Sequence, residues 1–146
     1  MGMFDSINTN SSALTAEKTR IDVISKNIAN EKTTRGTVGE PDRRQTVVFE
    51  EKKGSPFSHY LSEYTKKFNG EGVKVAGIVD DPTPFKLVYE PGHPDADENG
   101  YVRMPNVEIV KEMVDMIDAQ RAYEANITSI NASKTMLMKT LEIGKR

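Results

Sequence analysis

The chain contains no cysteine and no tryptophan. The lack of thiols excludes disulfide bonds, thiolate catalysis and cysteine-based zinc sites. Apolar residues make up 36% of the 146 residues, whereas about 45–50% is usual for a globular domain. A conventional single core would therefore be thin. The length favours one domain, or one small domain with extended arms.

An excess of one charge and a long apolar run are also missing. The chain has 20 basic and 22 acidic residues and a net charge of -2, so we expect no nucleic-acid partner. Because no apolar run reaches the length of a membrane span, we expect no direct membrane insertion. The first residues lack the basic patch and apolar stretch of a cleavable signal peptide, so we expect any export to use another route.

Amphipathic segments occupy the two ends of the chain. In the first segment, apolar residues recur mostly every seven positions, at Ile7, Leu14, Ile21, Ile24 and Ile28. In the second, they recur at steps of three, four or seven, at Met113, Met116, Tyr123, Ile127, Ile130, Leu137 and Leu141. Both spacings are typical of a coiled-coil seam. Seams that can be buried only on each other, or on other copies, indicate an assembly subunit rather than a catalyst.

These patterns predict the bounds of two helices. The N-terminal coiled-coil region is expected over residues 1–30, and its helix is expected to start at Asp5 or Ser6, either of which can cap its first turn. The second helix is expected over 106–146, with Asn106 as its N-cap and its last turn near Ile143. We expect Ile21, Ile24 and Ile28 to face Tyr123, Ile127 and Ile130 in antiparallel or near-antiparallel order.

The middle of the chain divides into two predicted regions. Residues 31–67 lack strong periodicity and are expected to form an extended arm with a short strand at 46–50. Residues 68–105 are expected to form a small β region. Apolar alternation in 73–79 and 85–89, with a turn between them, predicts a hairpin, and 101–103 predicts a third short strand. The predicted fold class is therefore α+β, with two long terminal helices forming a coiled-coil pair.

The chemical motifs do not complete a site. Residues 95–100 resemble the opening of an EF-hand calcium loop, but its twelfth position is Asn106 rather than glutamate and its ninth is Arg103. An acidic turn is the preferred interpretation. His59 and His93 have no partner at a recognisable catalytic spacing and are interpreted as exposed loop residues. We expect no catalytic residue, no metal and no cofactor.

Two short segments resemble the signatures of a known family. Asn27-Ile28-Ala29-Asn30, followed by Thr33, resembles the N-terminal signature of the bacterial flagellar rod and hook proteins. Residues 120–126, Gln-Arg-Ala-Tyr-Glu-Ala-Asn, resemble their C-terminal signature. Asn-Ile-Ala-Asn alone is a weak motif, but the two signatures in this order, each near its own terminus, are highly specific. The short length argues against the hook and distal rod proteins of this family. Residues 43–51 and 95–107 resemble segments of the proximal rod subclass. Thr37 stands where many hook and distal rod proteins carry an aromatic residue.

The resemblance implies a structural, non-enzymatic subunit of the proximal rod in the flagellar basal body. Such a subunit is exported through the flagellar type III apparatus and self-associates through its terminal helices in a helical assembly. The implied partners are the other proximal rod proteins, the rod-base adaptor and the export apparatus. The seams and signatures together give the expected assembly interface: Ile21, Ile24, Asn27, Ile28, Asn30, Thr33, Gln120, Arg121, Tyr123, Asn126, Ile127, Ile130, Leu137 and Leu141.

Polar signature residues receive specific expected roles. Side-chain amides around Asn27 and Asn30 are expected to replace lost helical hydrogen bonds where the first helix ends. Gln120, Arg121 and Asn126 are expected to make polar contacts between helices. Two alternatives from other classes are a coiled-coil adaptor or binding module associated with a secretion apparatus, and a small calcium-responsive domain. Circular dichroism of the monomer, with and without calcium, distinguishes the three.

Overall fold

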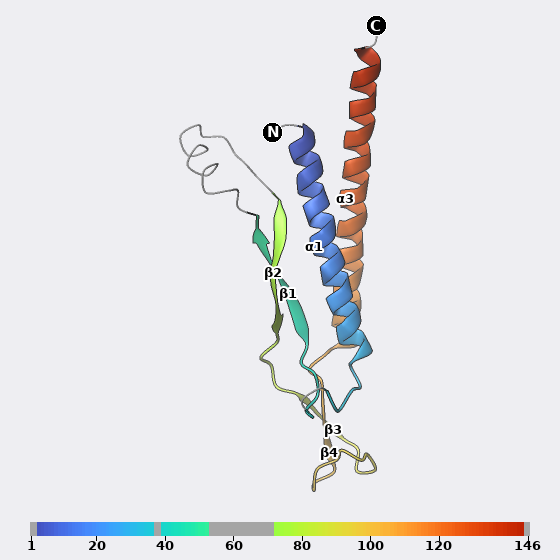
Figure 1. Cartoon of the computed structure of the whole chain (residues 1–146). Coiled ribbons are helices and arrows are strands. Elements are labelled where there is room, and N and C mark those ends of the chain that lie inside the picture. Colours follow the sequence, from blue (N-terminus) through green and yellow to red (C-terminus); the bar gives the residue numbers. More distant parts are fainter. Residues whose placement is uncertain (1–2, 37–38, 53–71, 145–146) are drawn as a thin grey trace. The chain divides into compact units, whose positions relative to one another are not determined.

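The computed structural model describes residues 3–36, 39–52 and 72–144 (Figure 1). Within these residues, two helices flank four strands, which confirms the predicted α+β class. The elements are α1 (Met3–Ala29), β1 (Gln45–Glu51), β2 (Val73–Asp80), β3 (Lys86–Tyr89), β4 (Tyr101–Met104) and α3 (Ile109–Ile143). His59 and the part of the predicted arm beyond residue 52 lie outside the described residues. Neither described helix is both long enough and apolar enough to cross a membrane.

The chain divides into two compact units. We call one the terminal unit, formed by Met1–Thr19, Phe49–Ala76 and Ala119–Arg146. The other, which we call the junction unit, consists of Arg20–Val48 and Gly77–Asp118. Both helices and the strands β1 and β2 contribute residues to each unit, so the division does not follow the order of the elements.

The two helices have nearly the predicted lengths but different ends. Backbone hydrogen bonds, from Asn30 N to Lys26 O and from Thr33 N to Asn30 O, continue the turn where α1 ends. The expectation that side-chain amides replace these bonds was therefore wrong. Helix α3 ends at Ile143 as predicted, but it begins at Ile109 rather than at an Asn106 cap. The side chain of Asn106 has other partners, described below.

The predicted strands are present, but the predicted hairpin was wrong. Strand β2 pairs with β1 of the arm, and β3 pairs with β4. Alternating apolar residues predict a strand without specifying its neighbour. The segment after β2 is held by the arm, because Asp81 N donates to Arg44 O at 2.8 Å and Arg43 Nη1 donates to Thr83 O at 3.0 Å. These contacts join the turn to β1 instead of folding β2 onto β3.

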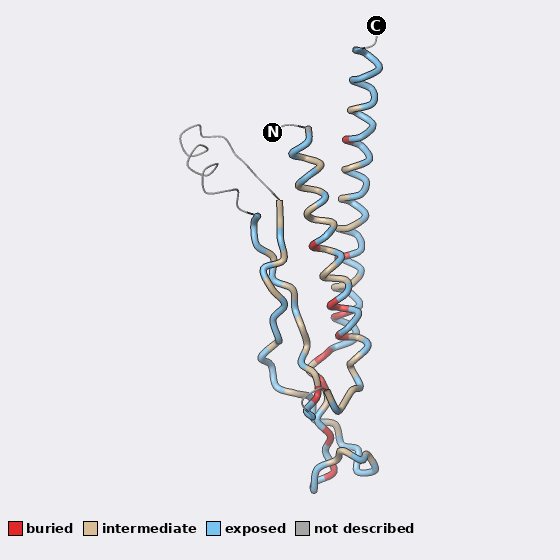
Figure 2. Tube along the Cα trace, in the orientation of Figure 1, coloured by how far each residue is buried: buried red, intermediate tan, exposed pale blue. Residues whose placement is uncertain are grey.

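The junction unit has a small apolar core around its hairpin. In the register of β3 and β4, Val88 lies opposite Val102, and Val102 is fully buried. Val107, Val23 and Ile24 are also buried in this unit (Figure 2). The Lys86 ammonium donates to the backbone carbonyl of Val107, which fastens the hairpin to the segment before α3. The core therefore surrounds the point where the arm, hairpin and helices connect.

The terminal unit buries mainly small residues. Ala16, Ala119 and Ser133 are buried, and Asn10 Nδ2 donates to Ser129 Oγ at 2.8 Å. Gly72 has a positive φ of 97°, and a Cβ built there would lie 2.2 Å from Ser12 Oγ, which accepts a hydrogen bond from Val73 N. Only glycine fits this close approach without strain. Larger apolar side chains of this unit remain exposed, among them Met136, Met138 and Leu141.

Candidate assembly site

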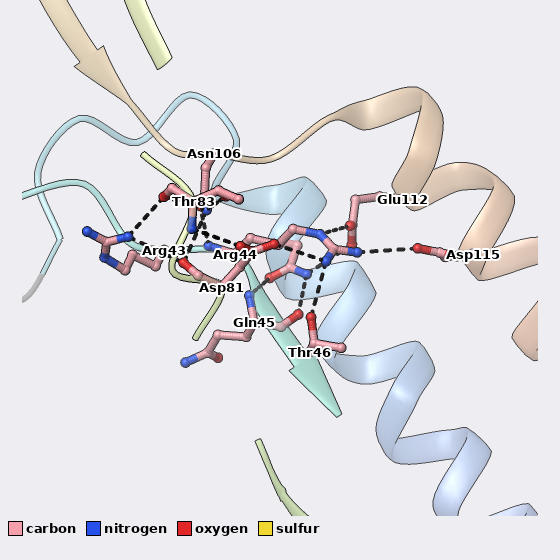
Figure 3. A network of polar contacts seen from close by, with 10 residues as sticks. Arg43, Arg44, Gln45, Thr46, Asp81, Thr83, Asn106, Glu112 and Asp115 are labelled. Carbon is pink, nitrogen blue, oxygen red and sulfur yellow. Dashed lines mark hydrogen bonds and ion pairs between the residues drawn. The ribbon is translucent and has the colours of Figure 1, made fainter. Parts of the chain in front are cut away.

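Arg44 is the centre of a polar network in the junction unit. Its Nε donates to Glu112 Oε1 at 2.6 Å, and its Nη2 lies 3.3 Å from Asp115 Oδ2. Its Nη1 lies 3.5 Å from Asp81 Oδ2 and donates to Thr46 Oγ1 at 3.2 Å. Figure 3 shows the guanidinium reaching the helix that carries Glu112 and Asp115 from the arm. One cation therefore connects β1, the turn after β2 and the first turns of α3.

Asn27 completes the network from α1. Its Nδ2 donates to Gln45 O at 2.8 Å, and its Oδ1 accepts from Gln45 N at 2.9 Å. This pair of bonds engages both backbone groups of one arm residue, as a neighbouring strand would. Nδ2 also donates to Glu112 Oε2 at 2.9 Å. Glu112 is 0% exposed and Asn27 4% exposed, so these polar groups are satisfied inside the unit rather than by water.

Asn106 holds the arm from the opposite side. Its Oδ1 accepts from Arg44 N at 2.7 Å, while its Nδ2 lies within hydrogen-bonding distance of Asp81 O, Thr83 O and Thr83 Oγ1. A side chain used in this way is not available to cap the helix. The amide therefore fixes the path of the arm just before α3 begins.

The charges around Arg44 raise its pKa. Burial alone would lower the pKa, but the hydrogen bond and the negative charge of Glu112 outweigh it, with Asp115 and Asp81 adding to the effect. Arg44 therefore stays charged and balances the buried carboxylate. The network is a structural link between the arm and the two helices rather than an acid–base pair. Each carboxylate oxygen of Glu112 already accepts a hydrogen bond, one from Asn27 and one from Arg44.

The first turns of α3 bury their polar side and expose their apolar side. Glu112 is fully buried and Asp115 half-buried, whereas Val110 is 71% and Val114 54% exposed. At about 100° per residue, the exposed apolar side chains fall within an arc of about 140°. We call this arc the outward face; its members are Ile109, Val110, Met113, Val114 and Ile117. A helix packed only within its own chain normally shows the reverse arrangement.

The acidic turn at 95–100 uses its carboxylates internally. Asp95 Oδ2 accepts from Thr34 Oγ1 at 2.7 Å, and Asp95 Oδ1 accepts from Arg35 Nε at 2.6 Å. Asp97 Oδ1 accepts from the backbone N–H groups of Asn99 and Tyr101, both at 2.9 Å. These bonds fasten the hairpin loop to the segment after α1. Among the described residues, no three His, Cys, Asp or Glu side chains converge as metal ligands would.

Comparison of the sequence with known proteins identifies the family of this chain. A family described as "Flagella basal body rod protein" matches residues 7–35, and "Flagellar basal body rod FlgEFG protein C-terminal" matches residues 98–143. The flagellar basal-body rod protein FlgC of Borreliella burgdorferi is 50% identical over 149 residues, covering 98% of each chain. The chain belongs to the flagellar basal-body rod proteins. The resemblance seen in its two signatures is thereby confirmed.

Two further relatives show how far this similarity extends among rod proteins. The flagellar basal-body rod protein FlgC of Bacillus subtilis is 50% identical over 151 residues, which cover 99% of this chain and 100% of the relative. The protein of the same name from Salmonella typhimurium is 43% identical over 134 residues, covering 92% of each chain. The whole rod protein, including the arm and the hairpin, is therefore similar to these relatives.

The predicted interface residues of this rod protein fall into both units. In the junction unit, two are buried and four half-buried: Ile24 and Asn27, then Ile21, Ile28, Asn30 and Thr33. In the terminal unit, four are half-buried and four exposed: Tyr123, Asn126, Ile130 and Leu137, then Gln120, Arg121, Ile127 and Leu141. Whether these residues contact neighbouring subunits stays a prediction.

The predicted register between the helices was wrong. In the junction unit, Asn27 contacts Glu112, and Arg20 lies 4.0 Å from Asp115. These contacts run in opposite chain order, so the two helical segments are antiparallel as expected. They place residues 21–28 beside the first turns of α3, not beside Tyr123, Ile127 and Ile130. A seven-residue seam matches a partner seam at several registers, and here polar contacts select one of them.

Sequence reasoning missed the central residues of the network. Neither Arg44 nor Glu112 is among the interface residues predicted from the sequence. Asn126 was expected to reach another helix, but its Nδ2 donates to Ala122 O in its own helix at 2.9 Å. The sequence carries no signal for Glu112, because an acidic side chain outside an apolar arc is normally exposed to water.

Proposed function

We propose that this protein is a structural, non-enzymatic subunit of the proximal rod, the shaft at the base of the bacterial flagellum. Family membership supports the location in the basal body, and the outward face of α3 carries the argument for assembly. Five apolar side chains on consecutive turns are exposed to water while a carboxylate on the same turns is buried. Another subunit that covers this face would restore the usual arrangement.

The polar junction supports a second part of the proposal, which is that the arm is held in a fixed direction. The buried Glu112 receives hydrogen bonds from the arm through Arg44 and from α1 through Asn27. A hydrogen-bonded charge pair has a preferred geometry, whereas an apolar contact does not. An arm fixed in this way can transmit force between neighbouring subunits in a rotating shaft.

Export and assembly follow from the same features. The small cores of the two units, the absence of cysteine and the exposed apolar side chains suit a chain that passes the type III export apparatus before it is fully packed. We propose that the chain then self-associates and binds the other proximal rod proteins and the rod-base adaptor. The terminal seams, including Ile130, Leu137 and Leu141, would be buried in that assembly.

The test is whether the chain is a component of isolated basal bodies. Basal bodies purified from the source bacterium are probed with antibody raised against this chain, and cells lacking its gene are examined in parallel. We expect the antibody to label the proximal part of the rod and the deletion strain to lack both rod and motility. Basal bodies that are complete without the chain would contradict the proposal.

The same fractionation separates the alternative function. An adaptor of the secretion apparatus would be found with the cytoplasmic or membrane fraction, and it would be strongly helical as an isolated monomer. A rod subunit would be found beyond the export apparatus, in detergent-resistant basal bodies. The exposed outward face favours the rod subunit, because an adaptor that buried its helices on each other would leave no such surface.

A further inference from the structure

The junction unit exposes a second surface with a different character. In the antiparallel register of the hairpin, Leu87 lies opposite Arg103 and Tyr89 lies opposite Tyr101. Alternate residues of a strand share a face, so these four side chains lie together on the side away from Val88 and Val102. We call this surface the hairpin face. Leu87 is 65% and Tyr89 63% exposed, so the hairpin face is uncovered in the monomer.

The composition of the hairpin face is typical of a protein–protein contact. Tyrosine and arginine are, with tryptophan, enriched at the energetic centres of interfaces. The rings of Tyr89 and Tyr101 meet edge to face, with centroids 5.3 Å apart and an interplanar angle of 63°, so each holds the other in place. Beside Tyr101 and Arg103 lies a groove of about 670 Å³, also lined by Thr34, Pro41, Ala96 and Asp97.

The two exposed surfaces carry opposite charges that lack partners. Arg103 is exposed on the hairpin face and forms no ion pair with any described residue. Asp118 is exposed one helical turn after Val114, at the border of the outward face, and it also has no ion-pair partner within the described part of the chain. The hairpin face combines aromatic and aliphatic side chains with a cation, and the outward face is apolar and is bordered by an anion.

We propose that the hairpin face of one copy docks on the outward face of the next copy, with Arg103 paired to Asp118. This inference rests on the proposed role as a rod subunit and names the contact between its copies. The occupant is a second copy because both surfaces are apolar and exposed, and their unpaired charges are opposite. A contact between two identical hairpin faces would instead bring two arginines together.

The symmetry of such a contact agrees with assembly. A contact between two different surfaces leaves one of each free at the ends, so copies can be added around a ring or along a helix. A contact between identical surfaces closes after two copies and stops. Repetition of the proposed contact therefore generates the layered arrangement that a shaft requires, and the same contact removes both exposed apolar surfaces from water.

Cysteine cross-linking tests the contact directly, because the chain has no native cysteine. A chain carrying both Leu87→Cys and Val114→Cys is expressed in the deletion strain, and purified basal bodies are treated with a mild oxidant. We expect a ladder of dimers, trimers and larger species on non-reducing gels. Chains with only Leu87→Cys or only Val114→Cys should remain monomeric, whereas co-expression of the two single variants should give a dimer.

Charge reversal provides a second, independent measurement. Arg103→Glu and Asp118→Arg each place like charges at the proposed contact, and the combination restores the pair in reverse. We expect each single reversal to lower incorporation into basal bodies by about threefold to tenfold, which corresponds to about 1 kcal/mol, and the double reversal to recover most of it.

The outcomes separate this inference from the proposed function. Basal bodies that contain the double-cysteine chain but give no ladder, or single-cysteine chains that dimerise with themselves, would overturn the proposed contact and leave the rod role intact. Absence of the parent chain from basal bodies would refute the rod role itself. A ladder together with recovery in the double reversal supports both.

Discussion

At the scale of single residues, the feature to explain is a fully buried carboxylate in a chain with so little core. Glu112 loses all contact with water, which is costly unless the charge is paired and hydrogen-bonded. Arg44 and Asn27 supply both conditions. The buried pair gives the junction a defined geometry, and removal of Arg44 would leave the charge of Glu112 uncompensated.

Replacement of Glu112 by alanine should therefore destabilise the junction unit strongly. We expect Glu112→Ala to lower the free energy of unfolding by about 1.5–3 kcal/mol, because Arg44 would lose its shortest charge-assisted hydrogen bond and keep only the longer contacts to Asp115 and Asp81. Urea unfolding followed by circular dichroism measures the change. Lys139→Ala removes an exposed pair with Glu142 at 2.8 Å and serves as the control with little effect. Equal stability of the two variants would mean that Glu112 is not buried and paired as described.

Asp95 should make the folding stability depend on pH. Hydrogen bonds from Thr34 first, then from Arg35, hold the pKa of Asp95 below its usual value, against the opposing effect of burial. A carboxyl whose pKa is lower in the folded state contributes stability above its unfolded pKa of about 3.9, and that contribution is lost as the pH falls through the lower folded value. Asp95→Asn should therefore reduce stability at neutral pH and flatten the acid limb of unfolding.

The control for this prediction is Asp22→Asn, since Asp22 is exposed and has no described hydrogen-bond or ion-pair partner. Thermal unfolding of the parent and both variants is compared between pH 2 and pH 7. If the stability of the parent and that of the Asp95→Asn variant changed with pH in parallel, the hydrogen bonds of Asp95 would not stabilise the contact between the segment after α1 and the hairpin loop.

At the scale of elements, the sequence predicted which segments become helices and strands but not how they pair. Periodicity located α1, α3 and all four strands to within a few residues, because apolar spacing depends on local geometry. The partner of β2 depends instead on contacts made by Arg43 and Arg44 with residues almost forty positions away. The start of α3 was misplaced for the same reason: a good capping residue had a better use in tertiary contacts.

A substitution at Asn106 tests whether its side chain caps α3 or holds the arm. Aspartate caps a helix as well as asparagine does, but it lacks the amide that reaches Asp81 O and Thr83 O. If Asn106 ties the arm, Asn106→Asp should cost about 1–3 kcal/mol of folding free energy, because backbone carbonyls lose their donor and face a carboxylate. The exposed Asn131→Asp on α3 is the matched control. A neutral Asn106→Asp would support the capping role instead.

At the scale of the whole molecule, the assembly role could be predicted from the sequence, because the patterns that indicate it can be recognised without knowledge of tertiary contacts. Seams at each end and two short signatures identified the family. The outward face could not be predicted in the same way. Val110 and Val114 look like core residues in the sequence, and only the burial of Glu112 on the opposite side shows that they point outward. Polar contacts determined which side of α3 faces inward.

The outward face therefore yields a prediction about assembly that is independent of folding. Val110→Asp places a charge on a side chain that is already 71% exposed, so the monomer should fold and be exported normally. In the assembled rod the same charge would lie in an apolar contact, where burial of an unpaired carboxylate is strongly unfavourable. We expect normal secretion of the chain, loss of incorporation into basal bodies and loss of swimming. Lys111→Asp, exposed on the same turn but outside the outward face, should retain motility. Retained swimming in the Val110→Asp strain would show that this face stays in contact with water after assembly.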